Sequence, residues 1–240
     1  MNLLFLHQNF PAQFKHLAPA LAQRGHDVKA LTLRPEAPAA WQGVDIVRYT
    51  PQRGNAPGIH PWVLDFESKV IRGEAVFRAA LEMKRAGYRP DAIVAHPGWG
   101  ESLFVKEVWP SARLGLYCEF YYRAQGADVG FDPEFSAPDP STGCRMLVKN
   151  ANLLMQFDAA DGALSPTRWQ ANGFPEPFRR HIQVVHDGID TRMVAPRPTV
   201  RITLPDRAGL ALSRQDEVIT FVNRNLEPGR GYHVLMRALP

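Results

Sequence analysis

The sequence has little cysteine and no long apolar run. Its two cysteines, Cys118 and Cys144, lie far apart without partners at metal-ligand spacing. This excludes a disulfide framework and a zinc site, and it favours two small apolar side chains in a reducing compartment. No apolar stretch approaches the ~20 residues of a membrane-spanning helix, and residues 3–6 are too few for the apolar core of a signal peptide. We therefore expect a cytoplasmic protein without a transmembrane segment, and peripheral membrane association stays open.

Several nucleotide-binding and hydrolase motifs are also absent. The first apolar run is followed by Gln8-Asn-Phe-Pro11, without the G-x-G-x-x-G turn that brings a backbone onto a pyrophosphate, so we do not expect a nicotinamide dehydrogenase. There is no P-loop, and no G-x-S-x-G elbow of an α/β-hydrolase. No basic run of five or more residues interleaves with aromatic residues, so nucleic acid is not an expected partner.

The composition is that of a folded protein with a sizeable core. Of the 240 residues, 45% are hydrophobic and 22% are charged, close to the usual balance of globular proteins. The formal net charge is +4, and the whole surplus lies in residues 168–240, which hold 11 arginines and 7 acidic residues. An arginine surplus favours an anionic ligand near that end, but a solvated arginine-rich surface would give the same count.

Short apolar runs alternate with amphipathic stretches along the chain. The apolar runs predict strands over residues 2–7, 27–33, 44–49, 91–96, 113–118, 163–165 and 182–186. The 3.6-residue periodicity predicts helices over residues 13–24, 62–86, 101–108 and 145–160. A strand, a helix and a second strand within about thirty residues form a βαβ unit. The fold class is therefore α/β, a Rossmann-like parallel sheet with helices on both faces.

A proline-containing stretch near the C-terminus divides the chain. Residues 196–205 carry three prolines, which is typical of a linker. After it, residues 218–223 predict a new apolar strand, and residues 231–239 begin a helix. We therefore expect an N-terminal Rossmann-like domain at residues 1–195, a linker at 196–215 and the first βα unit of a second Rossmann-like domain at 216–240. On this interpretation the chain is a fragment of a longer protein.

Polar and aromatic residues follow three of the predicted strands. Because ligands of open α/β sheets bind beyond the carboxyl ends of the strands, these side chains are candidates for one crevice. Such a mixture suits a sugar, which offers apolar ring faces to aromatic residues and hydroxyls to polar groups. At any single position an ordinary core or loop role is the alternative. The candidates are His7, Gln8 and Asn9 after the first strand, His96 and Trp99 after the fourth, and Glu119, Tyr121 and Tyr122 after the fifth.

Two arginines surround the turn that follows the strand predicted at 218–223. Arg224 and Arg230 lie six residues apart at the mouth of the next helix. Guanidinium groups and helix N-termini both favour phosphate, which makes this turn a candidate anion site. Solvated basic residues are the alternative.

At these residues the chain resembles a retaining glycosyltransferase of family 4, with the two-domain GT-B architecture. Residues 182–191 (Ile-Gln-Val-Val-His-Asp-Gly-Ile-Asp-Thr), followed by Pro196, resemble the family's hinge signature. Residues 221–231 resemble its Gly-Arg-x-x-x-x-Lys-Gly phosphate turn. Asp187 replaces the usual Asn, Asn223 the usual Gly and Arg230 the usual Lys. The glycine pair common after the first strand is absent.

The resemblance implies transfer of a sugar, with retention of configuration, from a nucleoside diphosphate sugar to a glycan, lipid or small-molecule acceptor. It implies no metal and no other cofactor. His96 would be the catalytic residue that reaches the donor sugar, and Arg224 and Arg230 would hold the donor diphosphate. The residues expected to bind the acceptor are Gln8, Asn9, Trp99, Glu119, Tyr121 and Tyr122.

The family's paired-glutamate donor motif would lie beyond Pro240, so the chain alone should be inactive. Two other functions stay open. One is a sugar-nucleotide epimerase of the same fold, and the other is a non-catalytic module that binds glycans or a partner. The downstream sequence would discriminate them, because paired glutamates favour transfer.

Overall fold

A computed structural model describes residues 1–206 and 209–239 of the chain. The chain divides into two compact units, which we describe separately. Unit 1 comprises Met1–Val129 and Pro138–Asp187, and unit 2 comprises Gly130–Ala137 and Gly188–Pro240. The predicted linker and second domain include residues 207, 208 and 240, which lie outside the described residues.

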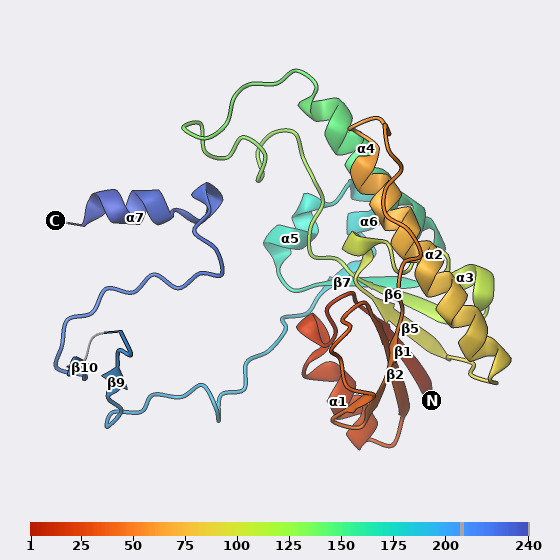
Figure 1. The fold of residues 1–240 in the computed structure, drawn as a ribbon, viewed down its shortest axis with the longest axis horizontal. Coiled ribbons are helices and arrows are strands. Elements are labelled where there is room, and N and C mark those ends of the chain that lie inside the picture. The colour runs from red at the N-terminus through yellow and green to blue at the C-terminus, as the bar shows by residue number, and fades with distance from the viewer. Residues whose placement is uncertain (207–208, 240) are drawn as a thin grey trace. The chain divides into compact units, whose positions relative to one another are not determined.

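Unit 1 is built on one eight-stranded sheet with the strand order β3-β4-β2-β1-β5-β6-β7-β8 (Figure 1). All neighbouring strands are parallel except β3, which runs antiparallel to β4. The predicted parallel sheet is therefore confirmed, and each strand expected in this unit is present. The strands are β1 (Asn2–Leu6), β2 (Asp27–Thr32), β3 (Ala40–Trp41), β4 (Val44–Arg48), β5 (Ala92–Ala95), β6 (Arg113–Tyr117), β7 (Gly162–Ser165) and β8 (Ile182–Val184).

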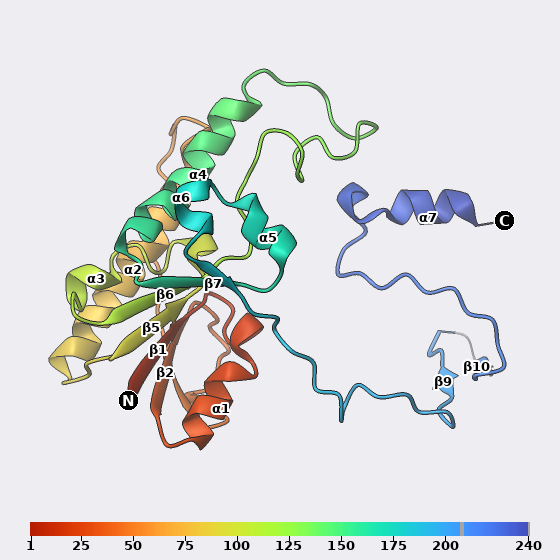
Figure 2. The same ribbon diagram turned by 180° about the vertical axis from the view of Figure 1, so that it is seen from behind.

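Helices cover both faces of the sheet (Figures 1 and 2). Successive side chains of β1 point to opposite faces of the sheet. On one face, Phe5 shares a core with Phe14 of η1 and Ala18 of α1. On the other face, Leu4 and Leu6 belong to a second core. That second core is covered by α2, α3 and α4. The helical elements are η1 (Ala12–Phe14), α1 (Leu17–Gln23), α2 (Leu64–Arg85), η2 (Pro97–Trp99), α3 (Val105–Val108), α4 (Thr142–Ala159), α5 (Arg168–Gly173) and α6 (Glu176–Arg179).

Two predicted helices differ from the structure. The helix expected over residues 13–24 is split into η1 and α1, and the helix expected over 101–108 is reduced to α3. Gly100 has a left-handed φ of 99°, and residues 101–104 form turns before α3 begins. Among the helices of the described residues, none combines the length and apolar composition of a membrane span.

The strand order of the sheet reverses between β1 and β5. The chain builds outward through β1, β2 and β4 on one side, and through β5, β6, β7 and β8 on the other. In open α/β sheets such a switch point opens a crevice beyond the carboxyl ends of the strands. His7 follows β1 and His96 follows β5, so the two histidines flank this point.

Unit 2 has little regular structure in its described part. Its elements are β9 (Ile202–Thr203), β10 (Ala211–Leu212), η3 (Pro228–Arg230) and α7 (Tyr232–Ala238). The helix predicted over 231–239 is present as α7, but the strand predicted over 218–223 is not formed. An apolar run becomes a strand only where a neighbour pairs with its backbone. Ile219 and Val222 are instead 73% and 92% exposed.

Candidate functional site

His96 and Glu119 form a hydrogen-bonded pair at the switch point. His96 Nε2 lies 2.9 Å from Glu119 Oε2. The residues follow β5 and β6, which are neighbours in the sheet. The imidazole is buried and the carboxylate is partly exposed, with side-chain exposures of 7% and 42%. The structure therefore joins a buried ring to an accessible carboxylate at the edge where the sequence predicts ligands.

The hydrogen bonds of His96 define its tautomer. Its Nδ1 accepts the backbone N–H of Gly98 at 3.1 Å, which caps η2. Since an N–H can only donate, Nδ1 carries the lone pair and the ring proton lies on Nε2, where it is donated to Glu119. In this arrangement neither ring nitrogen has a lone pair free to remove a proton.

Glu119 is held as an ionised acceptor. The hydrogen bond from His96 is the largest cause that lowers the pKa of its carboxyl. The amide of Gln13 also donates to Oε2, at 3.0 Å. Both bonds use the same oxygen, so Oε1 of this carboxylate can accept a ligand hydroxyl.

His7 lies behind this pair as a neutral ring. Its ring packs edge-on against His96 with centroids 5.3 Å apart, and its Nδ1 accepts the N–H of Asn9 at 2.9 Å. Burial, reinforced by the neighbouring His96, lowers the pKa of His7 to about 4, although Glu119 opposes the shift. The protonated form of His7 is therefore disfavoured at this edge.

Trp99 presents an aromatic face beside His96. The two rings stack with centroids 6.0 Å apart and an interplanar angle of 22°, and 38% of Trp99 is exposed. A cavity of about 110 Å³, here called the Trp99 cavity, adjoins both rings. Its lining includes Lys69, His96, Trp99, Glu119, Phe120 and Tyr122.

The loop that carries His96 and Trp99 is fixed by close packing against α2. A Cβ on Gly100 would lie 2.3 Å from the carbonyl oxygen of Lys69, so only glycine fits there. Arg72 donates from Nε to the Trp99 carbonyl at 2.8 Å. Glu101 is fully buried and accepts the Tyr49 hydroxyl at 2.7 Å, and burial raises the pKa of its carboxyl. Positions 96 and 99 therefore sit on a rigid support.

Tyr121 and Tyr122 line two different cavities. Tyr122 lines the Trp99 cavity, and its ring lies 3.9 Å from the Lys149 ammonium. Tyr121 packs against Phe174 and lines a second cavity of about 130 Å³, here called the Trp169 cavity. The lining of this cavity includes Glu119, Phe120, Tyr121, Arg123, Trp169 and Asn172.

Gln8 and Asn9 stay near the pair but line neither of these two cavities. The Gln8 carbonyl accepts the Thr32 hydroxyl at 2.8 Å, and the Asn9 N–H bonds to His7. These contacts tie the loop after β1 to its neighbours through the backbone. They do not test the predicted acceptor contacts of the two side chains.

Arg224 and Arg230 lie in unit 2 and are exposed. Arg230 Nε is 3.6 Å from Glu227 Oε2, and Glu227 also accepts the Asn225 amide at 2.7 Å. Both arginines contribute to lowering the pKa of the Glu227 carboxyl, after the larger effect of Asn225. The Arg230–Glu227 pair is long and solvent-exposed, so the guanidinium group of Arg230 can exchange it for a stronger anion.

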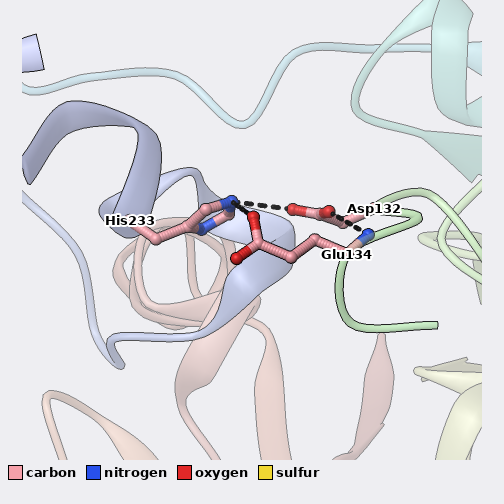
Figure 3. A group of neighbouring side chains, drawn as sticks. All are labelled: Asp132, Glu134 and His233. Carbon is pink, nitrogen blue, oxygen red and sulfur yellow. Dashed lines mark hydrogen bonds and ion pairs between the residues drawn. The ribbon is translucent and has the colours of Figure 1, made fainter. Parts of the chain in front are cut away.

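A second polar cluster in unit 2 consists of Asp132, Glu134 and His233 (Figure 3). His233 Nε2 is 2.9 Å from Asp132 Oδ2 and 3.9 Å from Glu134 Oε2. Arg237 binds both oxygens of Glu134, at 2.7 and 2.6 Å. Because a cation already neutralises Glu134, we assign these residues to an ion-pair network.

The sequence interpretation left several residues of the unit 1 edge without a role. Gln13 and Lys69 lie in helical segments, where periodicity does not show that their polar groups reach the edge. Tyr117, within β6, donates its hydroxyl to Asp187, 2.8 and 2.9 Å from its two carboxylate oxygens. Burial is the larger cause and this hydrogen bond the second cause that raise the pKa of the Tyr117 hydroxyl. Asp187 is thereby tied to the sheet beside His96.

The model of the glycosyl transferase family 4 group matches residues 24–194. The chain belongs to this family. The match includes His96, Glu119 and Asp187, whereas Arg224 and Arg230 lie outside it. No curated protein matches the chain.

Solved structures of GT-B glycosyltransferases are similar to this chain. A variant of Os79 from O. sativa in complex with UDP is 12% identical over 86% of this chain and 56% of its own, with a TM-score of 0.51. The catalytic domain of starch synthase IV from Arabidopsis thaliana, bound to ADP and acarbose, is 15% identical over 80% and 52%, with a TM-score of 0.49. Sucrose-phosphate synthase from Thermosynechococcus elongatus is 16% identical over 81% of this chain and 93% of its own, with a TM-score of 0.47. The chain spans about half the length of the first two proteins.

Proposed function

We propose that this chain is the acceptor-binding half of a retaining glycosyltransferase that uses a nucleoside diphosphate sugar. The His96–Glu119 pair at the switch point, with the exposed face of Trp99 beside it, carries the proposal. An ionised carboxylate accepts sugar hydroxyls, and an indole face stacks on the apolar side of a sugar ring. The similar Os79 structure is a complex with UDP, which supports a nucleoside diphosphate as the leaving group.

The state of His96 and Glu119 supports retention. An inverting transferase needs a general base that takes the proton of the acceptor hydroxyl. Both ring nitrogens of His96 are already engaged, and the lowered pKa of Glu119 makes it a weak base. In a retaining transfer the departing diphosphate oxygen takes that proton, so neither side chain has to.

In this proposal Arg224 and Arg230 hold the diphosphate. As the bond between sugar and phosphate breaks, negative charge builds on the phosphate oxygens, and two guanidinium groups would stabilise it without a metal. The exposure of both arginines and the weak pairing of Arg230 support this role. His96 and Glu119 would bind hydroxyls of the two sugars near the bond that forms.

The test uses a protein that joins this chain to the second domain that we propose follows it. Nucleoside diphosphate release is measured over a panel of donor sugars, and NMR determines the anomeric configuration of the product. We expect a retained configuration. Arg224→Ala and Arg230→Ala should each slow transfer by about 10²-fold, the scale of removing one preorganised charge donor. Arg230→Lys should be mild, and Arg237→Ala serves as the control.

The outcomes separate the parts of the proposal. An inverted product contradicts retention. Wild-type rates in both alanine variants contradict the diphosphate role and leave the arginines as surface residues. Conversion of the sugar nucleotide without any acceptor would show an epimerase instead.

A further inference from the structure

Two cavities meet at one carboxylate on the proposed acceptor edge. The Trp99 cavity and the Trp169 cavity share Glu119 and Phe120 in their linings. Their volumes, about 110 and 130 Å³, are similar, so neither is a minor extension of the other. The next two residues along the chain separate, because Tyr121 lines the Trp169 cavity and Tyr122 lines the Trp99 cavity. A ligand that binds Glu119 therefore lies beside both cavities.

Trp169 combines high exposure with a place in the lining of a cavity. It lies in α5, and 68% of its surface is accessible, although the same helix buries Ala171 and is followed by the buried Phe174. An exposed indole that lines a cavity favours ligand binding, because a ligand that stacks on it removes apolar surface from water.

The wall around Trp169 is held in place by polar contacts. Arg123 donates to the carbonyls of Asn172 and Gly173, at 2.9 and 3.0 Å, which joins the segment after β6 to the end of α5. Thr167 caps the start of the helix by accepting the N–H of Gln170. The cavity thus combines three aromatic side chains, Phe120, Tyr121 and Trp169, with the amide groups of Gln170 and Asn172, and such a mixture suits a sugar.

We infer that the acceptor is an oligosaccharide whose terminal ring lies in the Trp99 cavity and whose next ring lies against Trp169. This inference rests on the proposed acceptor role of the edge and adds the size of the acceptor to it. Glu119, at the junction, accepts hydroxyls of the terminal ring. A monosaccharide would use only the first cavity and would bind more weakly.

The test measures binding of the 240-residue chain to an array of immobilised mono-, di- and trisaccharides, with the affinity of each bound glycan then determined in solution. Trp169→Ala, Trp99→Ala and the control Trp62→Ala are compared with the wild type. Trp62 is 37% exposed and lines neither cavity. We expect Trp169→Ala to weaken binding of di- and trisaccharides about tenfold and to leave monosaccharide binding unchanged. Trp99→Ala should weaken both classes, and Trp62→Ala neither.

Three results would overturn the inference. Trp169→Ala could leave unchanged the affinity of every glycan whose binding Trp99→Ala weakens. In that case the second subsite does not exist, while the proposed function stands. The same holds if monosaccharides bind as tightly as their longer relatives. If the wild type binds no glycan on the array, both the second subsite and the acceptor role of the edge are wrong.

Discussion

The buried ring of His7 should make folding stability depend on pH in a defined window. Burial is the main cause that lowers the pKa of His7 to about 4 in the folded chain, from the ordinary value of 6.5. Between these values the unfolded chain binds more protons than the folded chain. The free energy of unfolding therefore falls as the pH drops below 6.5 and stops falling near pH 4.

The size of the effect follows from the two pKa values. One pKa unit corresponds to about 1.4 kcal/mol, so the contribution of His7 should fall by about 2 kcal/mol between pH 7 and pH 5. The measurement stays at or above pH 5 because Glu119 has a lowered pKa. Its own contribution is present above its unfolded pKa and is lost only at lower pH.

Urea unfolding at pH 7 and pH 5 tests this reasoning. The unfolding free energy of the wild type is compared with that of His7→Gln at each pH. The wild type should lose about 2 kcal/mol relative to the variant on going from pH 7 to pH 5. His16→Gln, which removes an exposed imidazole, should show the wild-type dependence. Equal pH dependence of the wild type and His7→Gln would refute the buried neutral state of His7.

Three further predictions concern the support of the site and the extent of the chain. Gly100→Ala should lower the unfolding free energy by about 3 kcal/mol, because its Cβ meets the Lys69 carbonyl at a left-handed φ of 99°. Gly126→Ala, with a φ of 71° and open space, should lower it by about 1 kcal/mol in the same thermal unfolding series. Tyr117→Phe should lower the unfolding free energy by about 1 kcal/mol, because the hydrogen bond to Asp187 is lost. An unchanged melting temperature would argue against a stabilising role of that bond. The 240-residue chain alone should turn over no nucleoside diphosphate sugar in a product-release assay, and turnover above a buffer control would contradict the need for a second domain.

The strand β1 was predictable because its side chains are buried on both faces of the sheet. The run in β1 reads as continuously apolar, and the structure buries Leu4, Phe5 and Leu6 completely. The run at 218–223 looks the same in the sequence but forms no strand, because pairing depends on neighbours that the run itself does not encode. Local pattern thus predicts the capacity for a strand, and the rest of the sheet decides whether it forms.

The positions of some candidate residues at the sheet edge could be predicted, but their contacts could not. His96 and Glu119 were both expected at the edge, yet their bond depends on β5 and β6 being neighbours, which periodicity does not reveal. Lys69 is almost fully buried in a helix whose spacing alone does not distinguish it from a solvated lysine. The proposed role of Trp169 rests on α5, a six-residue helix too short for its periodicity to be read.

The most direct test of the account is the effect of His96→Ala on turnover in a protein that joins this chain to the proposed second domain. Turnover is measured per mole of folded protein and compared with the melting temperature, with the exposed His60→Ala as the control. We expect turnover to fall by about 10²-fold with little change in melting temperature, because His96 would bind the reacting sugars. If the variant instead loses several degrees of melting temperature while its folded fraction turns over at the wild-type rate, His96 is a structural residue and the assigned site is wrong.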